Sequence, residues 1–354
     1  MDPTPQQIAA TQGPGTTLPV TDRPASGPGA GRDAALTTVT SQARGSYYGI
    51  APIKKPHWQW EIVLYFFLGG IAAGAYTLAT IAEVFGDRRH RPIVRAGRYI
   101  ALPCLLISPV LLIKDLGMPR RFFHMLRIVK LKSPMSLGTW GLLAFSGFAG
   151  LSAVAELAAQ GFGRGGWPAR LAGRLPRRGL GRAGSFFALF VGGYTGVLLS
   201  ATTVPLWAKN KYLLGPTFIS SALSTGAAAI TLALAATGQD DDAALHALEE
   251  AEILALTSEL GFLAAQGVHA GPLARPLLTG KYGTIFVPGV VLGMVWPLLA
   301  QLHGIRRGRR TRRGRIVTSL GVLLGGLILR WTLVYAGKDS ADDPAAYFAQ
   351  TRGE

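Results

Sequence analysis

Charged side chains inside the most apolar parts of the sequence are the first candidates for chemistry. Asp115 ends one apolar stretch, Glu259 lies deep within another, and Arg330 lies within the last one. An ionised group at membrane depth is costly unless it is paired, and a buried arginine almost requires a carboxylate partner. Two interpretations are open: an ion pair of Arg330 that holds helices in register, or a series of carboxylates that passes protons, with Asp115 first and Glu259 as a second route.

An aromatic residue and a pair of glycines indicate a second kind of site. Tyr194 lies within the apolar sequence VGGYTGVLLS, where its hydroxyl needs a partner. That partner is either the carbonyl of a bound ring compound or a neighbouring backbone carbonyl. Gly70 and Gly74 lie four residues apart in YFFLGGIAAGAY, a spacing that lets two helices approach closely. The alternative for these glycines is a cleft that admits a flat ring.

The residues that bind metals and haem are few and badly placed. The chain has one cysteine, Cys104, which by itself cannot build an iron–sulfur site. Its six histidines lie in expected loops or near the ends of apolar stretches, and His269 and His303 fall on opposite faces. We therefore predict no metal site, no intrinsic haem and no iron–sulfur cluster. Any electron-transfer centre must belong to another chain or be a bound small molecule.

The composition is typical of a membrane protein. Only 16% of the 354 residues are charged, whereas soluble proteins have about a quarter. The net charge of +17 comes from arginine runs between apolar stretches, which favours the positive-inside rule over nucleic-acid binding. A membrane-spanning helix needs about 20 apolar residues. Eight stretches are long enough: 61–85, 97–116, 136–160, 184–206, 213–237, 245–269, 283–303 and 316–337.

These stretches predict an all-α, polytopic membrane bundle of about eight transmembrane helices. The stretch 245–269 is the weakest, because it contains Glu249, Glu250, Glu252 and Glu259. Glu252 and Glu259 share one helical face, and Glu249 and Glu250, near the end of the stretch, are expected to be solvated. Around the transmembrane domain 57–338 we predict a flexible tail rich in Pro, Gly and Thr over 1–56, and a polar C-terminal tail over 339–354.

Arginine-rich loops set the expected orientation. The loops after the first, third and seventh stretches carry most of the arginines, which assigns them to the cytoplasm and both termini to the outer face of the cell membrane. The loop 117–135 is the exception, since it is basic and yet falls on the outer face. Its cations are Arg120, Arg121, Arg127, Lys130 and Lys132. A function of this loop that overrides the rule would explain the exception.

Four sequences within the chain resemble the NrfD/PsrC family, the membrane subunit of polysulfide reductase and related complexes. They are YFFLGGIAAGAY (65–76), KDLGMPRRFFHMLRIVKLKSPMSLGTW (114–140), YTGVLLSATTVPLWAKNKYLLGPTFISSALSTG (194–226) and RWTLVYAG (330–337). The resemblance covers residues 57–337. It implies two four-helix bundles that bind menaquinone or ubiquinone and carry no cofactor of their own. It also implies an extrinsic subunit with four-iron clusters, often with a molybdopterin catalytic subunit, in a complex of the polysulfide reductase or formate dehydrogenase type.

The resemblance also assigns roles to individual positions. Tyr194 matches the aromatic position that reaches the quinone, Asp115 opens the family loop, and Gly70 and Gly74 match glycines of the first helix. Histidine and asparagine ligands of some members have no counterpart within 61–80, so the resemblance leaves Glu61, Tyr65 and Trp207 as substitutes. Loop 117–135 is the implied docking surface for the iron–sulfur subunit, through Pro119, Arg120, Arg121, His124, Arg127 and Lys130.

Two other functions remain open. One is a structural membrane anchor that holds a redox partner without binding quinone. The other is a secondary transporter, a class that usually shows paired broken helices in two related halves. No such repeat is apparent in the sequence, although Pro205, Pro288 and Pro297 can break helices.

Overall fold

The computed structural model describes residues 56, 58–130, 132–161, 167–239, 241–307 and 311–341. All of them belong to one compact unit, 51–354. The predicted tail 1–56 and residues 342–354 of the predicted C-terminal tail lie almost entirely outside the described residues, so these two assignments stay predictions.

Long α-helices make up the described part of the chain, which contains no strand. Their bounds are α2 (Trp60–Phe85), α3 (Arg91–Asp115), α5 (Pro134–Ala159), α7 (Arg177–Ser200), α9 (Leu214–Thr237), α10 (Asp242–Ala270), α12 (Gly280–Val290), α13 (Trp296–Arg307) and α14 (Arg312–Ser340). Short elements connect them: η3 (Arg88–His90), η4 (Pro119–Arg121), α4 (Phe123–Arg127), α6 (Trp167–Gly173), α8 (Pro205–Lys209), η5 (Gly271–Ala274) and α11 (Arg275–Leu278). The all-α prediction is confirmed.

Seven helical segments of the described chain are long and apolar enough to cross a membrane, and α10 is not among them. α10 has the length of a membrane-spanning helix, but its acidic side chains make it too polar to meet the same criterion. The predicted number of eight spans is therefore supported for seven, and the weakest predicted span is the one that lacks support.

The seventh predicted span is continuous, although two prolines lie within it. A single π-helical segment, η6 (Val291–Val295), joins α12 to α13. Pro297 has no N–H to donate to the carbonyl of Gly293, and widening the helix by one residue accommodates that loss. Pro288 and Pro297 thus distort this helix without dividing it into two separate half-helices.

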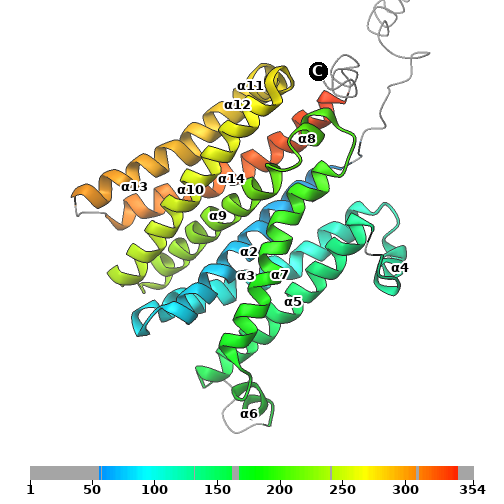
Figure 1. The fold of residues 1–354 in the computed structure, drawn as a ribbon. Helices are drawn as coiled ribbons and strands as arrows, with labels where there is room; N and C mark the ends of the chain where they lie inside the picture. Colours follow the sequence, from blue (N-terminus) through cyan, green and yellow to red (C-terminus); the bar gives the residue numbers. More distant parts are fainter. Residues whose placement is uncertain are drawn as a thin grey trace, which may run out of the picture. The chain divides into compact units, whose positions relative to one another are not determined.

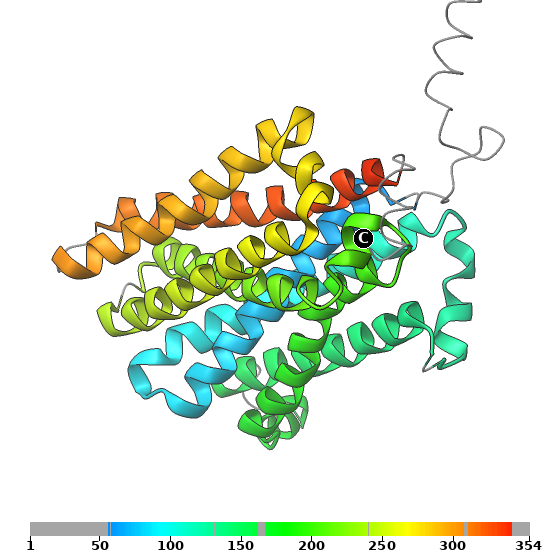
Figure 2. The same ribbon diagram turned by 45° about the horizontal axis from the view of Figure 1, so that its top comes forward.

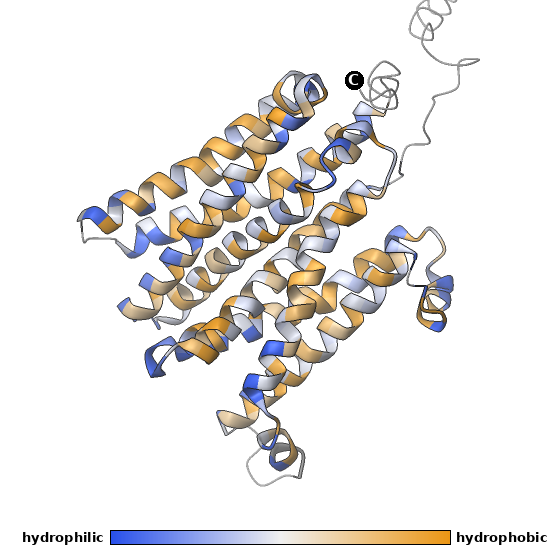
Figure 3. Ribbon diagram, viewed as in Figure 1, coloured by the Kyte–Doolittle hydropathy of each residue, from blue (hydrophilic) through white to orange (hydrophobic). Residues whose placement is uncertain are grey.

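The helices fall into two groups of four. α2, α3, α5 and α7 pack against one another, and α9, α10, the α12–α13 segment and α14 form the second group (Figures 1 and 2). α2 joins the groups, since it also packs on α9 and α14. Apolar residues dominate the middle of the helices, while polar residues gather mainly toward their ends (Figure 3). This is the distribution expected where lipid surrounds the middle of a bundle.

The contact between α2 and α9 is made by backbone atoms. A Cβ on Gly74 would overlap the carbonyl oxygen of Ala222 in α9, and a Cβ on Gly226 would overlap the backbone of Gly74 and Ala75 in α2. Small residues facing each other let two helix axes approach closely enough for main-chain contact. The structure therefore gives Gly74 the packing role that its spacing predicted.

We predict that Gly74→Ala destabilises the bundle, because the added methyl group has no space and the helices must separate. Overpacking of this kind costs about 1–3 kcal/mol. Thermal unfolding of the purified protein in detergent measures the effect. Gly147→Ala in α5 is the matched control, since nothing lies within 4 Å of a Cβ built there. Equal unfolding temperatures for the two variants would contradict the proposed contact.

Candidate functional site

A cavity of about 370 Å³ lies within the first group of helices. Its walls come from α2, α3, α5 and α7, and the short helix α4 closes one side. Most of the lining is apolar, with leucine, isoleucine and methionine side chains prominent. The cavity therefore lies among the first four membrane helices. A mostly apolar space with a few polar groups is the usual form of a site for a small organic ligand.

Tyr194 lines this cavity from α7, but its proton is already used. Its hydroxyl donates a hydrogen bond to the backbone carbonyl of Pro134 at the start of α5. Phe190, one turn earlier, stacks on its ring at 5.6 Å between centroids. Gly138 makes room for the ring, because a Cβ there would overlap it. Of the two partners that the sequence left open, the structure gives the backbone carbonyl.

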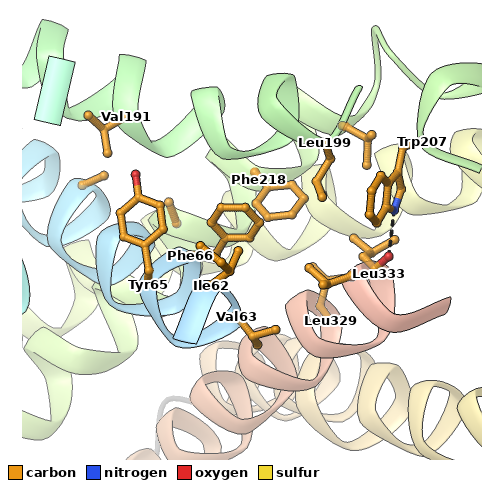
Figure 4. Close-up of a cluster of buried hydrophobic side chains, with 14 of the residues drawn as sticks. Ile62, Val63, Tyr65, Phe66, Val191, Leu199, Trp207, Phe218, Leu329 and Leu333 are labelled. Atoms are coloured by element: carbon orange, nitrogen blue, oxygen red, sulfur yellow. Dashed lines mark hydrogen bonds between the residues drawn. The ribbon is translucent and has the colours of Figure 1, made fainter. Parts of the chain in front are cut away.

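Tyr65 offers an unused phenol in the same cavity. Its side chain is 2% exposed, and its hydroxyl forms no hydrogen bond within the described part of the chain. In Figure 4 the hydroxyl points away from Ile62 and Phe66, toward α7 near Val191. A buried phenol usually finds a partner. Tyr65 is therefore the better placed donor for a ligand, although the sequence ranked it below Tyr194.

Ser146 was missed by the sequence analysis. It lines the cavity from α5, and its hydroxyl oxygen is shielded from solvent without a hydrogen-bond partner among the described residues. Serines inside helices commonly donate to the carbonyl four residues earlier, and Thr139 in the same helix does so with Met135 at 2.9 Å. A lone serine in the apolar run GLLAFSGFAG was the available signal. Its hydroxyl is a second candidate ligand contact.

Asp115 reaches the cavity from the last turn of α3, where it is half-buried. The neighbouring Lys114 turns outward and pairs with Glu61 at 3.3 Å, so Glu61 helps fix the start of α2 to the end of α3. Asp115 is thus the carboxylate that lines the cavity, while Glu61, proposed as a substitute ligand, does not line it.

The loop after α3 has one side on the cavity and one side outside. Phe122, Met125 and Leu126 line the cavity. The basic residues point outward, and every position of the predicted docking surface is exposed: Pro119, Arg120, Arg121, His124, Arg127 and Lys130. Phe123, Ile128 and Met118 are also more than half exposed. A mixed basic and apolar surface therefore lies directly over the cavity.

Arg330 in α14 is fully buried between the two groups of helices. Its guanidinium donates to the carbonyl of Phe66 in α2 at 3.1 Å and to the Ser221 hydroxyl in α9 at 2.8 Å. Glu259 in α10 is 1% exposed and accepts a 2.9 Å hydrogen bond from Ser224. Within the described residues the predicted ion pair of Arg330 is therefore not a direct contact, because serines of α9 lie between Arg330 and Glu259. Asp115 takes no part in this interaction.

A row of buried polar side chains follows α10 from one end to the other. Each member has a partner on another helix, and the row spans about 26 Å at 1.5 Å per residue. The pairs are Glu249 with Arg315 at 3.1 Å, Glu252 with Gln301 at 2.7 Å, Glu259 with Ser224, and Gln266 with Thr217. The expectation that Glu249 is solvated was wrong, because Arg315 of α14 covers it; Glu250 is exposed as expected.

Comparison with known proteins assigns the family. The sequence profile described as polysulphide reductase, NrfD, matches residues 52–340. The chain belongs to this family. This membership, together with the seven apolar helices found among the described residues, makes it an integral membrane protein.

Three relatives match this chain over most of their own length. The NrfD homolog of Haemophilus influenzae is 27% identical over 309 residues, covering 79% of this chain and 94% of that protein. A polysulfide reductase component of Wolinella succinogenes is 30% identical over 304 residues, again 79% of this chain and 94% of that protein. One of the subunits of the selenate reductase of Mesobacillus selenatarsenatis is 26% identical over 321 residues, 78% of this chain and 73% of that protein.

Besides Glu61, three residues expected at the quinone site of this NrfD protein lie outside the cavity. Gly70 packs under the guanidinium of Arg330, and Gly74 packs on α9. Trp207 in α8 is fully buried and donates to the carbonyl of Leu333 at 2.8 Å (Figure 4). Its ring also stacks on Trp58. Trp58 itself lines the cavity, so Trp207 supports one wall from behind.

Proposed function

We propose that this chain is the membrane subunit of a respiratory oxidoreductase complex that binds menaquinone or ubiquinone in the cavity of the first helix group. The observation that carries the proposal is an apolar cavity containing a buried phenol, Tyr65, whose hydroxyl has no partner among the described residues. In this proposal the chain exchanges electrons with a docked iron–sulfur subunit. Such complexes commonly place a molybdopterin catalytic subunit beyond it.

The cavity suits a quinone in size and polarity. A quinone head group is a flat apolar ring with an oxygen at each end, so it needs apolar walls and a hydrogen-bond donor near each oxygen. Tyr65 on α2 and Ser146 on α5 bring unused hydroxyls to the cavity from two helices. Tyr194 contributes its ring and the acceptor side of its hydroxyl, since its proton is held by Pro134.

The residues of the cavity can also handle protons. A bound quinol supplies two electrons and two protons when it is oxidised. The Tyr65 hydroxyl hydrogen-bonds a ligand oxygen and fixes the orientation of the ring. Asp115, at the end of α3 where the helix meets the exposed loop, accepts a proton and passes it to solvent. The same residues serve quinone reduction with the proton moving the other way.

The loop after α3 is the proposed docking surface. Its exposed arginines favour a partner with an acidic face, and the exposed apolar side chains beside them suit a desolvated contact centre. The inner side of the same loop lines the cavity, so a cluster-bearing partner on its outer side would lie close to the ligand. This arrangement explains why the loop is basic although it lies on the proposed outer face.

The substrate of the whole complex is proposed only by class. Relatives are named for polysulfide and selenate reductases. A reductase of a sulfur compound or an oxyanion is therefore our proposal for the complex. The transporter alternative is weaker, because the seventh predicted span stays continuous through Pro288 and Pro297.

We expect Tyr65→Phe to lower quinol-linked turnover of the purified complex about three- to tenfold, the value of one lost hydrogen bond. The unfolding temperature should stay unchanged, since the Tyr65 hydroxyl has no partner in the described part of the chain. Tyr194→Phe should instead lose about 1 kcal/mol of stability with its bond to Pro134. Tyr212→Phe, at an exposed position, is the matched control. If the Tyr65→Phe complex keeps wild-type turnover and wild-type binding of a quinol analogue, the proposed site is refuted. That result would favour the structural-anchor function.

The two proposed proton routes can be separated by substitution. Asp115→Asn should slow quinol oxidation about a hundredfold, as expected for loss of a general base. Glu259→Gln should leave turnover in detergent unchanged and reduce proton movement across the membrane of reconstituted vesicles, which a pH-sensitive dye measures. Glu250→Gln, exposed on the same helix, is the control. A Glu259→Gln complex with wild-type proton movement would remove the second route.

Docking through the loop after α3 predicts a specific loss of assembly. Arg120→Glu with Arg127→Glu should reduce co-purification of the iron–sulfur subunit by about tenfold or more, because like charges then face each other. Arg89→Glu with Arg182→Glu makes the same charge change on exposed arginines at the opposite end of the helices. If both double variants retain the partner equally, the loop is not the docking surface.

A further inference from the structure

A second cavity lies at the opposite end of the first helix group. It has a volume of about 620 Å³ and is bordered by the end of α2, the turn into α3 and the start of α7. Four arginines line it: Arg88, Arg91, Arg177 and Arg178. Its Glu83 lies about 27 Å from Tyr65 along α2 at 1.5 Å per residue. This arginine cavity is therefore separate from the proposed quinone site.

Two buried carboxylates hold the arginines of this cavity: Glu83, which lines it, and Glu156, which lies outside its lining. Arg177 pairs with Glu156 at 2.9 Å and with Glu83 at 3.1 Å. Arg91 pairs with Glu156 at 3.3 Å. The side chains of Glu83 and Glu156 are 6% and 2% exposed, so their charges are compensated inside the protein. These ion pairs hold Arg91 and Arg177 in fixed positions.

The arginines of this region outnumber its carboxylates. Arg95 and Arg98 also pair with these two glutamates, so four guanidinium groups share two negative charges. Asp87, the remaining carboxylate at the cavity, is already bound by the backbone N–H of Arg89 at 2.9 Å and by His90 at 2.8 Å. The cavity therefore has a positive charge that would attract an anion.

The rim of the cavity supplies arginines that the protein leaves unused. Arg88 and Arg178 are exposed, and within the described residues neither forms an ion pair. They lie on the turn after α2 and at the start of α7, on two sides of the cavity. Guanidinium groups bind phosphate oxygens with two parallel hydrogen bonds each. Fixed arginines at the base and exposed arginines at the rim make a site suited to a phosphate group.

The surroundings of the arginine cavity indicate which kind of molecule would supply a phosphate group. The cavity opens at the end of an apolar membrane helix, and Phe85, which precedes the lining residue Gly86, is 85% exposed. Basic pockets between transmembrane helices at the cytoplasmic surface are typical sites for anionic lipid head groups. We propose that the arginine cavity binds the phosphate of an anionic phospholipid head group, whose acyl chains begin beside Ile81 and Phe85 in the exposed last turn of α2. The bound lipid then stabilises the end of the bundle where α2, α3, α5 and α7 meet.

Native mass spectrometry and thermal unfolding of the purified full-length chain test this proposal. Phosphatidylglycerol, phosphatidylcholine and inorganic phosphate are added separately to delipidated protein in detergent. We expect phosphatidylglycerol to remain bound and to raise the unfolding temperature, while phosphatidylcholine does neither. Arg88→Gln with Arg178→Gln should weaken phosphatidylglycerol binding about tenfold or more, since each cation near an anionic head group contributes about 1 kcal/mol.

The control removes the same charge without touching the cavity. Arg89→Gln with Arg182→Gln changes exposed arginines in the same two segments, the turn after α2 and the beginning of α7. This double variant should retain wild-type binding of phosphatidylglycerol. Equal weakening in both double variants would reduce the effect to surface charge and overturn the site. Stabilisation by inorganic phosphate alone, without retention of phosphatidylglycerol, would support a phosphate site and overturn the lipid as its ligand. Since binding is measured without quinol, failure here leaves the proposed quinone site unaffected.

Discussion

The main-chain contact between α2 and α9 is the constraint on which the remaining structure depends. Because Gly74 and Gly226 lack side chains, the two helices approach until backbone atoms touch. In a membrane the hydrophobic effect does not drive helices together, so packing of this closeness replaces it. The contact makes α2 a member of both helix groups. It also places the carbonyl of Phe66 within reach of Arg330 on α14.

Key polar groups in the middle of the bundle find partners on other helices. Arg330 binds α2 and α9, and the acidic row of α10 finds its partners on α9, α13 and α14. Unsatisfied polar groups are expensive in an apolar environment, so each such pair fixes the register of two helices. The second group thus contains a series of separate polar pairs along α10, whereas the first group contains an apolar cavity. This division suits one group to protons and the other to a hydrophobic ligand.

The first group has opposite chemistry at its two ends. At the start of α2, apolar walls, the unused phenol of Tyr65 and a basic outer loop form the proposed quinone and partner site. At the end of α2, arginines and buried glutamates join all four helices in a network of ion pairs. Removing one partner of such a network would leave Glu83 or Glu156 buried without its cation, which is costly.

The sequence by itself determined the helical class, five of the seven membrane helices to within about four residues at each end, and the loop over the cavity, because runs of about 20 apolar residues have few other solutions in lipid. The predicted stretches 97–116 and 184–206 were displaced, because α3 and α7 begin earlier, in arginine-containing segments that apolar runs do not reveal. The sequence also found Tyr194 and Asp115, which the cavity brings together. Only the tertiary structure decided that the Tyr194 hydroxyl donates to the Pro134 carbonyl, while the hydroxyls of Tyr65 and Ser146 have no partner among the described residues. Which hydroxyl lacks a partner depends on neighbouring helices, and so does the burial of Glu249 by Arg315. Apolar periodicity along one chain does not encode these distances, because they are fixed by how separate helices pack.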